Sequence, residues 1–168
     1  MNIRLDHIGI AVPDLESGSA FWRILGLLEF EDELNEDQGV SLRFFATDPA
    51  EEPTKIELLE PTGPDTPIGR FLERNGPGVQ QVAFRVDDLD ALLTRLIEAD
   101  IRLINSTPTS GAHGSRIAFV HPKSTGGVLV ELLEDLLEVR EPLPDLVELH
   151  DDLVLLEAVQ HRGDFAEC

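Results

Sequence analysis

Hydrophobic and polar positions follow the same order twice along the chain. Residues 5–12 and residues 79–86 each read as a strand of eight with one apolar face. An aspartate follows each strand, Asp14 in the first copy and Asp88 in the second, where it can cap the start of an amphipathic helix. The repeated order predicts two modules built on one plan.

The two copies also end alike. Residues 55–60 resemble residues 129–134, and further strand-like sequence precedes them at 40–45 and 116–121. A glycine-rich turn at 122–127 is typical of a hairpin into the last strand. We therefore expect an α+β fold in which a pair of βαβββ modules forms the sheet.

These patterns predict one domain at residues 1–134, with modules at about 3–61 and 77–134. The linker at 62–76 contains a short helix that a threonine caps and a proline begins. Residues 135–168 form a more acidic C-terminal extension, for which leucine spacing predicts an amphipathic acidic helix after two prolines. That helix would cover the domain or a dimer seam, or would bind a partner. Its apolar face consists of Leu146, Leu149, Leu153 and Leu156.

Charge narrows the choice of partner. The chain of 168 residues has 33 acidic and 13 basic side chains, a net charge of −20, which disfavours nucleic acid and anionic membranes as partners. No run of 18 apolar residues predicts a membrane span, and the N-terminus reads as a strand, not a leader. The single cysteine, Cys168, excludes an internal disulfide and a cysteine zinc site. We expect a cytoplasmic protein.

Four polar residues occupy matching places in the two modules. His7 and Gln81 are 74 positions apart, and so are Glu57 and Glu131. Each glutamate faces away from its apolar neighbours because a strand alternates faces. A carboxylate on a concave sheet surface is costly unless it is neutralised or bound. The mixed nitrogen and oxygen set suits a divalent ion such as Co, Ni, Mn, Zn or Mg, so the set predicts a metal site.

Each of the four residues, taken alone, also fits an ordinary role as a solvated strand glutamate, a core histidine or a surface glutamine. Other chemistry has little support, since the chain contains no G-x-S-x-G, Walker or G-x-G-x-x-G motif. The basic residues Arg116, His121 and Lys123 lie near the glycine-rich loops and could bind an anion, or they could form an ordinary hairpin surface.

Three stretches carry a family resemblance. Residues 5–12 read LDHIGIAV, residues 55–61 read KIELLEP and residues 121–132 read HPKSTGGVLVEL. Together they resemble the methylmalonyl-CoA epimerase family of the vicinal oxygen chelate superfamily, which also contains glyoxalase I. The last stretch is the most specific, the first is shared across the superfamily, and the likeness covers about residues 3–134.

The resemblance implies a glyoxalase-like fold, in which the paired modules form a cupped mixed sheet around one divalent metal. It places the metal ligands at His7, Glu57, Gln81 and Glu131. In such epimerases the thioester and carboxylate oxygens of the substrate chelate the metal. One base removes the proton between them and a second acid returns it on the other face. Glu131 would be one of these bases, because a carboxylate within reach can take the proton.

Two positions depart from the family pattern. The epimerases have His-His where this chain has Gln80-Gln81, so one histidine ligand has become glutamine. A glutamate that serves as the other base in some epimerases aligns with Leu42 here. Glu57, pseudo-symmetric to Glu131, is the candidate replacement.

The expected function is therefore a metal-dependent epimerase of methylmalonyl-CoA or a similar 2-substituted acyl-CoA. The alternatives are another glyoxalase-like metal-dependent lyase or isomerase, and a catalytically silent small-molecule binding protein of the same fold. The basic residues Arg116, His121 and Lys123 would attract the CoA in spite of the negative net charge. A homodimer is the default assembly in this superfamily.

Overall fold

The computed structural model describes residues 1–48, 53–111 and 114–135. Contacts divide the chain into the units Met1–Leu136 and Leu137–Cys168. The expected acidic helix of the C-terminal extension lies outside the described residues. Within the described part, no helix is long and apolar enough to cross a membrane.

The elements form two similar modules joined by a linker with one helix. The first module contains β1 (Ile3–Ala11), α1 (Leu15–Leu25), β2 (Leu28–Glu29), β3 (Glu33–Asn35), β4 (Val40–Ala46) and β5 (Lys55–Pro61). The linker contains α2 (Pro67–Asn75). The second module contains β6 (Gly78–Val86), α3 (Leu89–Glu98), β7 (Thr109–Ser110), β8 (Arg116–Val120), a one-turn 3-10 helix (Pro122–Ser124) and β9 (Leu129–Glu134).

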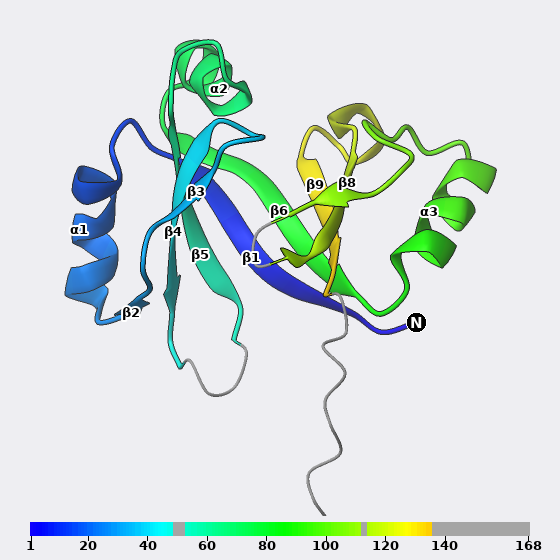
Figure 1. The fold of residues 1–168 in the computed structure, drawn as a ribbon, viewed down its shortest axis with the longest axis horizontal. Coiled ribbons are helices and arrows are strands. Elements are labelled where there is room, and N and C mark those ends of the chain that lie inside the picture. The colour runs from blue at the N-terminus through cyan, green and yellow to red at the C-terminus, as the bar shows by residue number, and fades with distance from the viewer. Residues whose placement is uncertain (49–52, 112–113, 136–168) are drawn as a thin grey trace, which may run out of the picture. The chain divides into compact units, whose positions relative to one another are not determined.

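The strands form one mixed sheet in the order β2-β4-β5-β1-β6-β9-β8-β7, with β3 also paired to β4. The first strands of the two modules, β1 and β6, pair antiparallel at the centre. Each module then adds its last strand in parallel, β5 beside β1 and β9 beside β6. Figure 1 shows α1 and α3 on the outer sides of the two halves of this sheet. The predicted α+β fold of paired modules is confirmed.

Both long helices begin at the aspartates that the sequence predicts as caps. Asp14 and Asp88 accept hydrogen bonds from the third residue after them, which satisfies free amides at the helix start. Gly26 ends α1 with a φ of 87°, in the left-handed region that glycine favours. Asp100 takes the left-handed conformation after α3, with a φ of 57°.

A second contact at each helix start repeats between the modules. Glu60 at the end of β5 accepts a hydrogen bond from the Leu15 amide at 2.8 Å. Glu134 at the end of β9 accepts one from the Leu89 amide at 3.3 Å. The last glutamate of each repeated strand motif therefore has a structural role, since negative charge is favourable at a helix N-terminus.

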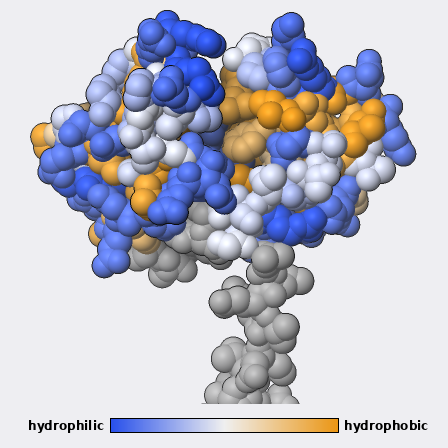
Figure 2. Space-filling view, turned by 45° about the horizontal axis from the view of Figure 1, so that its top comes forward, coloured by the Kyte–Doolittle hydropathy of each residue, from blue (hydrophilic) through white to orange (hydrophobic). Residues whose placement is uncertain are grey.

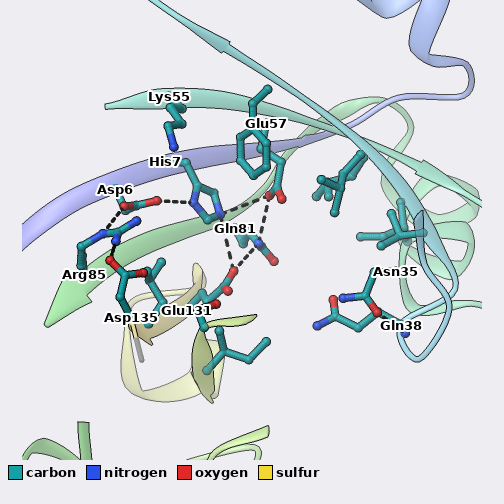
Figure 3. Close-up of a pocket in the computed structure, with 18 residues that line it drawn as sticks. Asp6, His7, Asn35, Gln38, Lys55, Glu57, Gln81, Arg85, Glu131 and Asp135 are labelled. Carbon is teal, nitrogen blue, oxygen red and sulfur yellow. Dashed lines mark hydrogen bonds and ion pairs between the residues drawn. The ribbon is translucent and has the colours of Figure 1, made fainter. Parts of the chain in front are cut away.

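The strands separate an outer apolar face from an inner face. In β5, Leu58 packs on the helix side with Leu15 and Phe45, whereas Glu57 and Leu59 face inward. Figure 2 shows a largely hydrophilic surface that is hollowed between the two halves, with apolar residues along the hollow. The inner face holds the pocket drawn in Figure 3.

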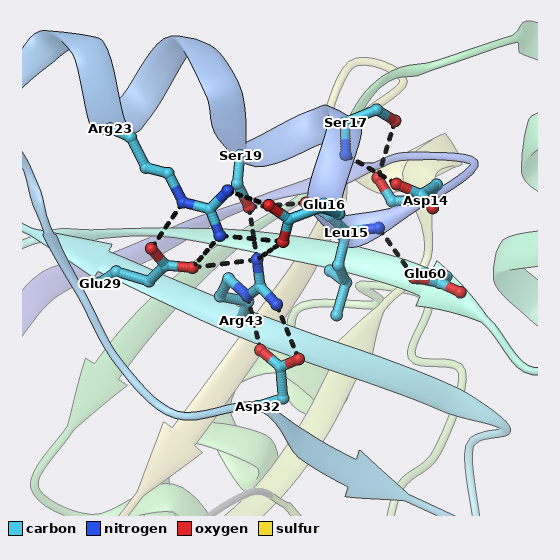
Figure 4. A network of polar contacts seen from close by, with 10 residues as sticks. All are labelled: Asp14, Leu15, Glu16, Ser17, Ser19, Arg23, Glu29, Asp32, Arg43 and Glu60. Atoms are coloured by element: carbon cyan, nitrogen blue, oxygen red, sulfur yellow. Dashed lines mark hydrogen bonds and ion pairs between the residues drawn. The ribbon is translucent and has the colours of Figure 1, made fainter.

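On the outer face of β4, the buried side chain of Arg43 contacts both α1 and the loop between β2 and β3. Arg43 donates to Ser19 Oγ at 3.0 Å and to both oxygens of Asp32 at 2.5 and 2.8 Å (Figure 4). It also pairs with Glu29 at 2.9 Å. The hydrogen bonds from Arg43 hold the pKa of Asp32 below its usual range. The network fixes α1 against the sheet.

Replacing this arginine should lower stability in a pH-dependent way. Because Asp32 has a depressed pKa in the folded protein, its contribution is complete above the unfolded-state value near 4 and is lost as the pH falls through the folded-state value. We expect Arg43→Met to lower the free energy of unfolding by about 1–3 kcal/mol at pH 7, and by less at pH 3.

Urea unfolding at the two pH values measures this difference. The matched control is Arg74→Met, which removes an exposed arginine of α2 and should change stability by less than about 0.5 kcal/mol. An equal loss at both pH values would contradict the proposed contribution of the ion pair.

Candidate active site

Four central strands bring together the four residues that the sequence singled out. β1 contributes His7, β5 contributes Glu57, β6 contributes Gln81 and β9 contributes Glu131, and these strands are neighbours in the order β5-β1-β6-β9. All four side chains are buried and line one pocket (Figure 3). The equal spacing in the two modules therefore reflects a single shared site.

The polar atoms of these four side chains converge on a small region. His7 Nε2 lies 3.2 Å from Glu57 Oε2 and 3.5 Å from Glu131 Oε2. The Gln81 amide nitrogen donates to Glu131 Oε2 at 2.6 Å and to Glu57 Oε2 at 3.4 Å. Two carboxylates, one from each module, thus meet beside a single ring nitrogen.

The residues present fit a divalent ion. His7 Nε2 is buried yet makes no hydrogen bond of acceptable geometry in the structure, although it points at two carboxylates. Among the described residues, no three His, Cys, Asp or Glu side chains form a ready-made metal cluster. Gln81 turns its nitrogen toward the carboxylates, and a flip of the amide would turn its oxygen there instead. One imidazole, two carboxylates and an amide oxygen suit a borderline or hard divalent ion.

The electrostatics of the site favour a positive charge at its centre. Burial by itself lowers the pKa of His7, but the contacts with Asp6, Glu131 and Glu57 outweigh burial and raise this pKa to about 12. Burial raises the pKa of Glu131, and the nearby His7 opposes that rise only in part. The protein therefore holds a proton where a metal would bring its own positive charge.

A fifth residue, Asp6, orients the histidine from the other side. Consecutive strand residues normally face opposite ways, but the register between β1 and β6 shifts between Leu5 and His7. Such a bulge re-aims side chains, and here both Asp6 and His7 line the pocket. Asp6 Oδ1 lies 2.9 Å from His7 Nδ1. This contact fixes the ring so that Nε2 faces the two glutamates, as carboxylates do for metal-ligating histidines.

Asp6 is held in turn by Arg85 of β6. Arg85 Nε donates to Asp6 Oδ2 at 2.7 Å, and the same guanidinium pairs with Asp135 just after β9. Burial by itself raises the pKa of Asp6, but hydrogen bonds with His7 and Arg85 hold it well below its usual range. The residue is therefore a carboxylate at neutral pH. The polar contacts thus run from His7 through Asp6 and Arg85 to Asp135.

An apolar wall surrounds the polar centre. Leu42 and Phe44 of β4 and Leu133 of β9 line the pocket beside the four polar residues. The edge of the Phe44 ring packs against the His7 ring, with centroids 5.7 Å apart. Leu42, which aligns with the glutamate that is the second base in some epimerases, contributes an apolar side chain at this position. An apolar lining strengthens the electrostatic contacts inside it.

The three basic residues that the sequence proposed for anion binding lie outside this pocket lining. Arg116 Nη2 contacts both oxygens of Asp90 at 2.7 and 2.8 Å, and its Nη1 donates to Glu134 at 2.8 Å. The His121 ring accepts a hydrogen bond from the Lys123 amide at 3.0 Å, which caps the 3-10 turn. Arg116 therefore already has two carboxylate partners.

Sequence reasoning missed four charged residues of the pocket, Asp6, Lys55, Arg85 and Asp135. Strand alternation assigns Asp6 to the outer face, and the bulge that reverses this has no sequence signal here. Arg85 and Lys55 could have been found, because Arg85 is four residues from Gln81 and Lys55 is two residues from Glu57. Side chains two or four residues apart on a strand point to the same face, so Arg85 lies on the face of Gln81 and Lys55 on the face of Glu57.

The fold and the site together define a class of proteins. A family model described as "Glyoxalase/Bleomycin resistance protein/Dioxygenase superfamily" matches residues 6–119. The ethylmalonyl-CoA/methylmalonyl-CoA epimerase of Cereibacter sphaeroides is 44% identical over 132 residues, which are 77% of this chain and 96% of that protein. The chain belongs to this superfamily and, within it, to the family of the methylmalonyl-CoA epimerases.

Solved structures agree with this assignment. Methylmalonyl-CoA epimerase from Mycobacterium tuberculosis aligns with a TM-score of 0.71 at 41% identity, over 86% of this chain and 91% of that chain. A methylmalonyl-CoA epimerase in complex with methylmalonyl-CoA and NH4+ aligns with a TM-score of 0.74 at 39% identity, over 83% of this chain and 98% of that chain.

The role of Asp6 can be tested by metal binding. Asp6→Asn removes the negative charge behind His7 and breaks the pair with Arg85, so we expect the affinity for Co²⁺ or Zn²⁺ to fall by about 10- to 100-fold. Competition with a chelating dye measures the affinity. Glu73→Gln, in an exposed position on α2, should leave it unchanged. An Asp6→Asn protein that folds normally and binds metal as tightly as wild type would contradict this role.

Proposed function

We propose that the chain interconverts the 2R and 2S forms of methylmalonyl-CoA, or of a similar 2-substituted acyl-CoA, by removing and returning the α-proton. One observation carries this function: two buried carboxylates from equivalent strands of the two modules, Glu57 and Glu131, meet beside His7 Nε2. Epimerisation needs proton transfer on both faces of one carbon, and a pseudo-symmetric pair of carboxylates offers a group for each face. The names of the relatives support the same substrate.

Glu131 is proposed as the base that takes the α-proton. Its burial raises the pKa of its carboxyl group, which makes the carboxylate a stronger proton acceptor than an exposed glutamate. In the metal-free protein, the Gln81 amide nitrogen donates to Glu131 Oε2 at 2.6 Å.

Glu57 is proposed as the partner on the opposite face. It is equally buried, and its Oε2 is 3.2 Å from His7 Nε2. This assignment fills the role left empty at Leu42, which contributes only an apolar surface to the pocket. Removal of a proton on one side and its return on the other would then invert the α-carbon.

A divalent ion held by His7, Glu57, Gln81 and Glu131 would supply positive charge beside the carbonyl and carboxylate oxygens, where negative charge develops. The chain's own residues prepare that position, since Asp6 orients the His7 ring from behind. Leu42, Phe44 and Leu133 add apolar surface to the same pocket. The identity of the ion, among Co, Ni, Mn, Zn and Mg, is a matter for elemental analysis of the purified protein.

The remaining parts of the proposal concern the rest of the substrate and the assembly. The anionic part of CoA is proposed to bind to the basic residues His121, Lys123 and Arg116. Arg116 would first have to release its carboxylate partners, Asp90 and Glu134. A cytoplasmic homodimer remains our expectation. Light scattering on the full chain would give its mass in solution.

The catalytic roles separate in an exchange assay in heavy water. Glu131→Gln should slow α-proton exchange of methylmalonyl-CoA by about 10²- to 10⁴-fold, because the base is lost while a neutral oxygen remains. Glu57→Gln should keep exchange on one epimer and block conversion to the other. Mass spectrometry follows exchange, and chiral analysis follows conversion. The exposed Glu73→Gln serves as the control.

Two results would change these assignments. If Glu57→Gln loses both activities and regains them with added metal, Glu57 is a metal ligand and not a base. If the wild-type protein exchanges no α-proton with any of the five ions supplied, the epimerase function is wrong. A catalytically silent acyl-CoA binding protein, the candidate favoured by the apolar Leu42, would then take its place.

A further inference from the structure

Lys55 places a positive charge in the same pocket. It begins β5, lies opposite His7 in the register between β1 and β5, and precedes Glu57 by two residues. It lines the pocket together with Asp6 and Arg85. Figure 3 shows its nitrogen turned toward the side of the pocket that holds Asp6 and His7.

The ammonium of Lys55 is held by an aromatic ring and not by a carboxylate. Its Nζ lies 5.4 Å from the centroid of the Phe44 ring. Within the described residues, Lys55 makes no hydrogen bond or ion pair, whereas Arg85 pairs with Asp6 and Asp135. A cation–π contact positions a cation without neutralising it. Lys55 therefore keeps its charge available to an incoming anion.

The charges of the pocket favour such an anion at this lysine. Glu57 and Glu131 would balance a divalent ion, and Arg85 balances one of its two carboxylate partners. Without Lys55 the lining would remain negative and would repel a substrate carboxylate. With both Lys55 and a divalent ion the charges of the described lining would sum to zero, and Lys55 lies on the inner face beside the proposed reacting groups.

We propose that Lys55 binds the free carboxylate of the acyl group and so selects 2-carboxyacyl-CoA thioesters over acyl-CoAs that lack this carboxylate. The proposal rests on the proposed function and names the group that reads its substrate. Ammonium and carboxylate form strong, charge-assisted hydrogen bonds. Because the carboxylate is attached to the α-carbon, holding it also orients the α-proton toward Glu131 or Glu57.

A pair of unreactive ligands tests the proposal by binding alone. 2,2-Dimethylmalonyl-CoA has no α-proton, and pivaloyl-CoA replaces its carboxylate with a neutral methyl group. Calorimetry on the Co²⁺-loaded protein gives the ratio of the two dissociation constants. We expect wild type to prefer the carboxylate ligand, and Lys55→Met to reduce this preference by about 10- to 100-fold. Lys55→Arg, which keeps the cation, should retain most of it.

The outcomes separate this proposal from the function on which it rests. Arg74→Met, which removes an exposed arginine of α2, should leave the ratio unchanged. If Lys55→Met weakens both ligands equally, the lysine contacts the shared CoA part and the proposal is wrong. An unchanged ratio in Lys55→Met also overturns it. If wild type binds both ligands equally, the proposal is wrong, whereas if wild type binds neither ligand, the proposed function itself fails.

Discussion

Two buried carboxylates held next to one another set the main constraint on this protein. Glu57 and Glu131 come from separate modules, yet their Oε2 atoms share the same neighbours, His7 Nε2 and the Gln81 amide. Carboxylates so placed repel one another in a low dielectric unless positive charge lies between them. A proton on His7 supplies that charge in the protein alone, and a divalent ion would supply it in the working site.

The fold provides the rigid support that this constraint requires. Antiparallel pairing of β1 with β6 joins the modules, and the parallel neighbours β5 and β9 bring the glutamates to the same inner face. On the outer side, Glu60 and Glu134 attach each helix to the end of its strand. Each repeated strand motif thus presents one glutamate to the pocket and another to a helix.

Most of the fold and the four central residues could be predicted because they depend on spacing. The 74-residue offset pairs His7 with Gln81 and Glu57 with Glu131, and strand alternation gives the face of each. Asp6 could not be predicted, because a register shift against β6 turns it to the same side as its neighbour His7. The partners of Arg116 also depend on tertiary contacts, with Asp90 on α3 and Glu134 on β9, which no local pattern encodes.

Anomalous diffraction from crystals soaked in Co²⁺ or Zn²⁺ tests directly whether these four side chains hold a divalent ion. We expect one strong peak within about 2.0–2.6 Å of His7 Nε2 and of oxygens from Glu57, Gln81 and Glu131. The Gln81 amide would be flipped relative to the metal-free protein. A fully occupied ion elsewhere, with these four side chains still bonded to one another, would show that they do not form the metal site.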